Sequence, residues 1–390
     1  MSEQPAAPDA SAETAEQQVV RGLGWPGAGR EVAGTGLGWP STTAVSRGTG
    51  EGFGPQAAPV LGVVHSRLAV GTTPAPAPSA SHGRSSAAGP SAVVQAAEPA
   101  PALHASAASS PLPRPAHTRV IVVANQKGGV GKTTTAVNVA AALVEQGQRV
   151  LVLDLDPQGN ASTALGIAHE PGTAGIYEAL IEGRPLSALV RESAEHPGLF
   201  GVPATVDLAG AEIELVSLPR RESRLRLLVD DALTAQRSPA TTRFDFVFID
   251  CPPSLGLLTL NALVAADEVL IPVQCEYYAL EGLGQLLKTV ERVRAELNPA
   301  LAVSNVLLTM YDGRTRLAAE VADDVRHHFA GAVLDTVVPR SVRISEAPSF
   351  ARTVLGYDPG SSGALAYRAA ARELAMRGAA SPATDRRGRD

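Results

Sequence analysis

The chain has 390 residues and a net charge of −6, with 45% of its residues hydrophobic and 18% charged. This length suffices for one large core or for two domains. No apolar run reaches the ~18 residues that a membrane span requires, so no span is predicted. The mildly acidic balance excludes a generally basic surface, so any binding to nucleic acid must come from a local patch.

The two cysteines, Cys251 and Cys275, show no CxxC spacing, and the first residues lack the charged and apolar regions of a secretory signal. Both features are typical of a reduced, intracellular chain. We therefore expect a cytoplasmic protein.

Residues 1–117 are rich in Ala, Pro, Ser and Gly, contain no lysine and show no sustained helical or strand periodicity. Such a segment buries too little apolar surface to offset its chain entropy, which predicts a disordered arm. The sequence Gly-Leu-Gly-Trp-Pro occurs at 22–26 and again at 36–40. Aromatic side chains dominate interface energies, so the repeats could dock an arm-binding protein. Accidental duplication in low-complexity sequence is the other interpretation.

Residues 118–378 are predicted to form one α/β domain, followed by a flexible tail at 379–390. Apolar strand-length runs are found at 120–124, 149–154, 246–249, 268–273 and 303–309. Helix-like segments lie between them, such as 133–146 and 281–297, and a last helix is expected at 363–376. This alternation predicts a mostly parallel, doubly wound sheet with helices on both faces and a glycine-rich loop after the first strand.

The chain contains three lysines, and two of them, Lys127 and Lys132, lie in that glycine-rich loop. The loop ends in Gly-Lys-Thr like a phosphate loop, although Gln126 stands where the first glycine is usual. Backbone amides at the start of a helix favour an anion, and an ammonium fits such a loop better than a guanidinium. The loop therefore predicts binding of ATP and Mg²⁺. The residues expected to bind the nucleotide are Lys127, Gly128, Gly129, Val130, Gly131, Lys132, Thr133 and Thr134.

Two acidic groups follow predicted strands at the edge where open α/β sheets bind ligands. Asp250 ends an apolar run, as expected for an acid that holds Mg²⁺ together with the Thr133 hydroxyl. Asp154 and Asp156 follow another strand and would point the same way if the strand extended that far. Capping of a turn is the alternative for this pair. Cys251 is interpreted as a small packed side chain.

The loop sequence Lys-Gly-Gly-Val-Gly-Lys-Thr-Thr resembles the deviant Walker A motif of the ParA/MinD group of dimerising ATPases. Further stretches at 202–212, 275–282 and 338–349 resemble the Soj-type, chromosome-partitioning ParA ATPases, so that the likeness covers nearly all of residues 119–377. The resemblance implies that Lys127 crosses a dimer interface to the partner's nucleotide. It also implies that Asp156 orients the attacking water, so that Lys127, Lys132 and Asp156 carry catalysis.

The same resemblance implies a homodimer that forms with ATP, binds DNA non-specifically on the nucleoid and is released when a ParB-like partner stimulates hydrolysis. It assigns Arg314 and Arg343 to DNA, with Arg340 and Arg316 close by, and places Met310 and Pro339 beside the adenine. Arg314 and Arg316 are expected to begin a helix. A solvated surface charge is the alternative for each arginine.

Four other functions remain open from the sequence. A MinD-like membrane ATPase needs a C-terminal amphipathic helix, whereas residues 363–378 are rich in alanine. An iron–sulfur reductase needs cysteine ligands that meet across a dimer, and Cys251 is poorly placed for this. A ParA-like ATPase that positions another cargo, or an ATP-gated scaffold, is also compatible with the sequence.

Overall fold

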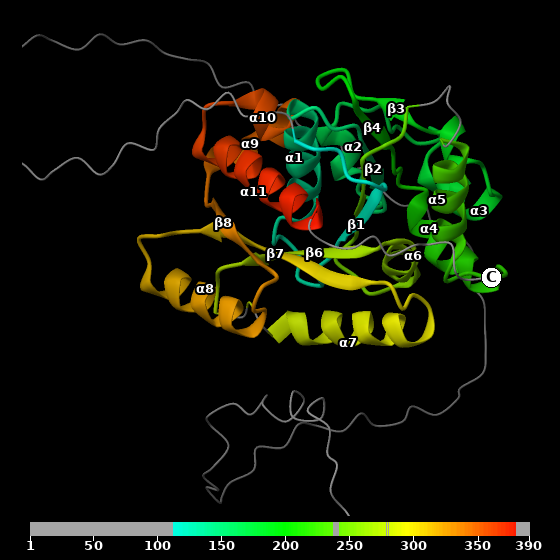
Figure 1. Ribbon diagram of the computed structural model, residues 1–390. Coiled ribbons are helices and arrows are strands. Elements are labelled where there is room, and N and C mark those ends of the chain that lie inside the picture. The colour runs from blue at the N-terminus through cyan, green and yellow to red at the C-terminus, as the bar shows by residue number, and fades with distance from the viewer. Residues whose placement is uncertain (1–111, 237–241, 278, 280, 380–390) are drawn as a thin grey trace, which may run out of the picture. The chain divides into compact units, whose positions relative to one another are not determined.

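The computed structural model describes residues 112–236, 242–277, 279 and 281–379, which contain one eight-stranded sheet (Figure 1). The strand order is β3-β4-β2-β5-β1-β6-β7-β8, and only the β3–β4 pair is antiparallel. The strands are β1 Arg119–Val123, β2 Val150–Asp154, β3 Arg191–Glu192, β4 Leu199–Val202, β5 Phe246–Asp250, β6 Glu268–Gln274, β7 Ala302–Tyr311 and β8 Val333–Pro339.

Helices cover both faces of this sheet. In Figure 1, α1 lies beside α11, and α7 and α8 lie on the other side of β6 and β7. One face carries α1 Lys132–Glu145, α2 Asn160–Ala164, α9 Val342–Glu346, α10 Val354–Tyr357 and α11 Ser362–Ala379. The other carries α3 Ile176–Glu182, α4 Leu208–Glu214, α5 Arg224–Ala235, α6 Leu257–Ala265, α7 Glu281–Glu296 and α8 Arg316–His328.

The two cores follow from the alternation of side chains along the strands. In β1, Ile121 and Val123 belong to one buried cluster, while Val120 and Val122 belong to the other. Successive side chains of a strand point to opposite faces, so a strand covered on both sides must be apolar throughout. All five residues of β1 are buried accordingly.

The predicted fold class is confirmed: the described residues form a doubly wound, mostly parallel α/β sheet with the glycine-rich loop after its first strand. The sequence analysis did not identify β3, β4 or β8. The edge strand β8 carries the polar residues Asp335 and Thr336, which interrupt its apolar run, and β4 has only four residues. No helix among the described residues is both long and apolar enough to cross a membrane.

The predicted disordered arm and tail fall mostly on residues 1–111 and 380–390, which lie outside the described residues, as do both Gly-Leu-Gly-Trp-Pro repeats. The end of the predicted arm contacts the domain. Leu112 is buried, and its carbonyl accepts a hydrogen bond of 2.9 Å from Gln148 Nε2. Arg243 donates to the carbonyls of the two arm residues at 115 and 116, each at 2.6 Å.

Candidate functional site

The glycine-rich loop lies at the carboxyl end of β1, and its backbone requires glycine at two points. Gly129 and Gly131 have φ angles of 74° and 91°, in the left-handed region that side chains disfavour. A Cβ on Gly129 would have no atom within 4 Å, so backbone conformation and not packing demands glycine there. The loop leads directly into α1, whose first residue is Lys132.

Two residues outside the predicted site hold this loop in place. Asn125 donates through Nδ2 to the Pro272 carbonyl at 2.8 Å and accepts from the Lys127 amide at 3.0 Å. Thr309 in β7 donates through Oγ1 to the Val130 carbonyl at 2.8 Å. The loop is therefore fastened to the neighbouring strands on one side of β1 before any ligand binds.

Lys132 lies inside the loop and is only 7% exposed. Its Nζ lies 3.4 Å from the Lys127 carbonyl oxygen. Burial lowers the pKa of Lys132, while the acidic groups Asp250, Cys251 and Asp156 act in the opposite direction. A buried ammonium with one long hydrogen bond can be stabilised by an anion, so the arrangement suits a phosphate group.

Asp250 ends β5 and pairs in register with Asp154 at the end of β2. Asp250 is completely buried, and neither of its carboxylate oxygens accepts a hydrogen bond of ordinary geometry from the described residues. Burial, followed by the charge of Asp154, raises the pKa of Asp250 well above its usual value, while the nearby Thr133 hydroxyl lowers it. A buried carboxylate without donors is costly unless a cation or donor joins it.

This unpaired carboxylate fits a Mg²⁺ ion. Among the residues that the structure describes, no three His, Cys, Asp or Glu side chains gather around a possible metal position. Mg²⁺ commonly keeps several waters and takes only one or two protein ligands together with substrate phosphates. Thr133 and Asp250, beside a phosphate-binding loop, meet that requirement.

Asp154 and Asp156 differ in their surroundings because β2 ends at Asp154. Asp154 accepts hydrogen bonds from the Asp156 amide and from both the amide and the hydroxyl of Ser162. Burial raises the pKa of Asp154 to about 6 in spite of these bonds. Asp154 thus organises the turn, and its carboxylate is already occupied.

Asp156 is also buried, and its Oδ1 accepts a hydrogen bond from the Gln158 amide at 3.0 Å. The turn continues through Gly159, whose φ of 64° and close approach to His169 leave no space for a Cβ. The structure therefore holds the backbone around Asp156 firmly while leaving acceptor capacity on its carboxylate.

Lys127 differs from Lys132 in both exposure and partner. Its side chain is 34% exposed, and its Nζ lies 3.3 Å from Glu276 Oε2, beyond the end of β6. Met310 and Pro339 also reach this edge, because they lie at the carboxyl ends of β7 and β8 and the register pairs Tyr311 with Pro339. Met310 has a φ of 50°, an uncommon conformation for a residue with a side chain.

The four arginines expected to contact DNA are all more than half exposed, and each is paired with a carboxylate of its own chain. The pairs are Arg314–Asp312 at 2.8 Å, Arg316–Glu320 at 3.3 Å, Arg340–Glu276 at 3.5 Å and Arg343–Glu346 at 3.1 Å, and Arg343 also pairs with Asp358 at 3.3 Å. Exposed pairs of this kind contribute little to stability and exchange readily with other ions. The predicted helix start at Arg314 is wrong: α8 begins at Arg316, after the Thr315 hydroxyl caps it.

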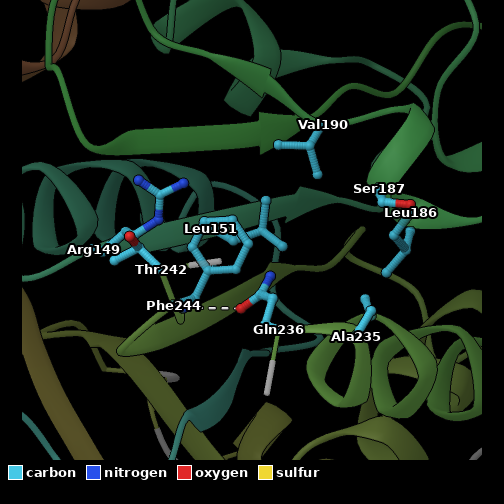
Figure 2. Close-up of a pocket in the computed structure, with 10 residues that line it drawn as sticks. Arg149, Leu151, Leu186, Ser187, Val190, Ala235, Gln236, Thr242 and Phe244 are labelled. Carbon is cyan, nitrogen blue, oxygen red and sulfur yellow. Dashed lines mark hydrogen bonds between the residues drawn. The ribbon is translucent and has the colours of Figure 1, made fainter. Parts of the chain in front are cut away.

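A pocket of about 310 Å³ lies at the opposite edge of the sheet (Figure 2). Arg149 immediately precedes β2 and Phe244 lies just before β5, so the pocket is at the amino ends of these strands. The Arg149 guanidinium stacks on Phe200 and Phe244, and the Gln236 side-chain oxygen accepts from the Phe244 amide at 3.0 Å. This pocket is separate from the glycine-rich loop and contains none of the predicted site residues.

Comparison with known proteins supports the same interpretation of the loop. Residues 118–303 match the family described as an AAA domain. The chain is 52% identical over 259 residues to the chromosome partitioning protein ParA of Myxococcus xanthus, an alignment that covers 66% of this chain and 88% of that protein. It is 49% identical over 260 residues to the sporulation initiation inhibitor protein Soj of Bacillus subtilis, covering 67% and 99%.

A solved structure described as cobyrinic acid a,c-diamide synthase from Mycobacterium smegmatis, with bound ADP and magnesium, is 40% identical with a TM-score of 0.56. The match covers 66% of this chain and 94% of that one. The fold and the loop thus define an α/β ATPase with a phosphate loop. About half of the aligned residues are identical, and the alignments span nearly the whole length of these partitioning relatives. The chain therefore belongs to the ParA/Soj family of chromosome-partitioning ATPases.

Proposed function

We propose that this ATPase is a dimerising switch that binds DNA non-specifically with ATP and hydrolyses the ATP when a ParB-like partner stimulates it. The cycle would drive segregation of a chromosome or plasmid from a nucleoid-associated pool in the cytoplasm. The buried pair of Lys132 and the unpaired Asp250 carries the proposal, because together they match the charges of a nucleotide phosphate and its metal ion.

Within one subunit, the loop residues 128–134 cradle the phosphates and Lys132 neutralises their charge. Thr133 and Asp250 would hold the Mg²⁺ ion, which when bound would offset the negative charge that develops in phosphoryl transfer. Asp156 orients the water that attacks the terminal phosphate. Met310 and Pro339 border the adenine.

The second lysine completes the site from the other subunit. Lys127 pairs with Glu276 and not with the Asp250–Asp156 group that surrounds Lys132. An exposed and weakly paired ammonium is free to approach a partner's phosphates. Hydrolysis therefore depends on dimerisation, and a single subunit turns over slowly.

DNA binding is assigned to Arg314, Arg316, Arg340 and Arg343. Dispersed arginines that contact phosphates position a protein on DNA without reading sequence. All four are exposed and have weak partners within the chain, so DNA phosphates can replace those carboxylates. The Gly-Leu-Gly-Trp-Pro repeats, which lie outside the described residues, are candidate sites for a further, arm-binding protein.

The test is an ATPase assay with the full chain over a range of protein concentrations, with and without DNA and a ParB-like protein from the same genome. The proposal expects specific activity to rise with protein concentration, and to rise further when DNA and the partner are both present. Activity per subunit that is independent of concentration and of both additions would exclude the switch. A ParB-like protein without effect, in the presence of concentration-dependent activity, would favour another cargo.

A further inference from the structure

Glu276 joins two loops that the proposed function assigns to different tasks. Its Oε2 lies 3.3 Å from Nζ of Lys127, which follows β1, and its Oε1 lies 3.5 Å from Nη2 of Arg340, which follows β8. The sheet order β1-β6-β7-β8 brings these loops to one edge, with Glu276 just beyond β6. One carboxylate is therefore shared between the trans-acting lysine and an arginine of the proposed DNA surface.

The position of Glu276 does not depend on these two ion pairs alone. Its amide donates to the Gln274 carbonyl at 2.8 Å, and its own carbonyl accepts from the Ala279 amide at 2.9 Å. The Gln274 side chain also donates from Nε2 to Glu276 Oε1. A tight turn thus presents the carboxylate to Lys127 before a nucleotide or a second subunit arrives.

These ion pairs favour one position of the Lys127 side chain but are too weak to fix it there. The side chains of Lys127, Glu276 and Arg340 are 34%, 44% and 60% exposed. Exposed ion pairs shift an equilibrium by about two- to fivefold at most. Lys127 must leave Glu276 in order to reach the partner's nucleotide. The ion pair therefore lowers the affinity of dimerisation without preventing it.

Arg340 has the opposite effect on the affinity of dimerisation. It carries the same charge as Lys127 and uses the other oxygen of the same carboxylate, so it weakens the attraction between Glu276 and Lys127. It also leaves the carboxylate paired after Lys127 has moved. Removal of Arg340 would therefore strengthen the hold on Lys127, whereas removal of the Glu276 charge would abolish it.

We infer that Glu276 is a positioning residue that holds Lys127 in the resting subunit, and that Arg340 moderates this hold. The inference rests on the proposed function, because it requires Lys127 to act on the partner's nucleotide. The inference adds Glu276 as an acid that controls when Lys127 is free to reach the partner. It predicts that removal of the Glu276 charge and removal of the Arg340 charge change the dimer affinity in opposite directions.

The test measures the dissociation constant of the full-length dimer by analytical ultracentrifugation, with Mg²⁺ and a non-hydrolysable ATP analogue and without DNA. Each dimer releases two such pairs, so E276Q is expected to tighten the dimer by about four- to 25-fold, and R340Q is expected to weaken it by about twofold. E222Q is the matched control, since Glu222 also pairs with one exposed arginine, at 2.8 Å, but lies away from the loop. It should leave the constant unchanged.

An unchanged or weaker dimer in E276Q would overturn the inference; a weaker one would mean that the acid itself contacts the second subunit. Shifts of the same sign in E276Q and R340Q would also overturn it, because a merely structural role predicts that. Should E276Q fold poorly, E276D retains the charge on a shorter stem and should shift the constant in the same direction by less. A wild-type chain that stays monomeric with the analogue contradicts the proposed function itself, a result distinct from a normal dimer that ignores E276Q.

Discussion

The two lysines of the glycine-rich loop are five residues apart in sequence, yet the structure gives them opposite surroundings. Lys132 is 7% exposed and faces Asp250 and Asp156, whereas Lys127 is one-third exposed and pairs with the carboxylate of Glu276. The first region holds its charge largely out of water, whereas the second leaves its charge in contact with solvent. The comparison teaches that one short loop can place two lysines in opposite environments, one buried and one exposed.

The largest effect is expected from K132A. Loss of the buried ammonium should reduce ATP hydrolysis by ~10²-fold or more, because charge stabilisation in a water-excluded site is worth several kcal/mol. K132R should also fail, since a planar guanidinium does not replace an ammonium inside this loop. Steady-state phosphate release measures both variants. Near-normal activity of K132R would contradict the fit we describe.

D250N should separate activity from stability. Asp250 is completely buried beside the charge of Asp154, so removal of its own charge should stabilise the metal-free protein by about 1–3 kcal/mol while it lowers Mg²⁺-dependent hydrolysis. Because burial raises the pKa of Asp250, the wild-type carboxyl becomes protonated as the pH falls, and the difference in stability should then narrow. Thermal unfolding in EDTA between pH 5 and 8 checks this. Destabilisation at pH 8 would show that the acid is satisfied in a way that the structure does not indicate.

Much of the buried half of this comparison is predictable from sequence. Two of its features are local sequence patterns, in which each residue is recognised from its neighbours along the chain. They are the apolar run that ends in Asp250 and the glycine loop that ends in Gly-Lys-Thr. Asn125 and Thr309 were not predicted as loop supports. Thr309 reaches the Val130 carbonyl across 179 positions of sequence, and Asn125 reaches the Pro272 carbonyl across 147. No local pattern encodes such a contact.

The exposed half is harder to predict for the same reason. Glu276 meets Lys127 and Arg340 only because the sheet order places β1, β6 and β8 near one another, and β8 itself was not recognised from its interrupted apolar pattern. The predicted start of α8 is two residues too early, because Arg314 lies in a turn where it bonds Asp312. Arg314 Nη2 lies 2.8 Å from Asp312 Oδ2. Side-chain partners in the turn, and not helix propensity, decided that boundary.

Substitutions in the exposed arginines should have intermediate effects on DNA alone. R314Q and R343Q should each weaken DNA binding by several-fold and reduce the slope of log affinity against log salt by about 1. Hydrolysis without DNA should stay near the wild-type rate. A titration of fluorescent DNA at several salt concentrations measures the slope. An unchanged slope would mean that the arginine is an ordinary solvated charge.

The smallest effect concerns His196, far from the loop. Its Nε2 lies 2.9 Å from Thr353 Oγ1, and burial lowers its pKa although Glu195 and Glu145 act in the opposite direction. The native state thus favours the neutral ring, so the unfolded chain binds more protons below its own pKa of about 6.5. The free energy of unfolding should therefore decrease as the pH drops below that value. In H196Q the decrease should be smaller, because the contribution of His196 is absent. Identical pH profiles of Tm for both proteins would contradict the assignment.

The most direct test of the central claim mixes two inactive subunits. K127A retains its own Asp156 but donates no lysine, whereas D156A donates Lys127 but lacks its own acid. If Lys127 acts across the interface, an equal mixture should regain up to about a quarter of the wild-type ATPase activity, since half of the dimers are mixed and each has one complete site. A mixture as inactive as either variant alone, with mixed dimers present, would place Lys127 in its own subunit's site and contradict the account.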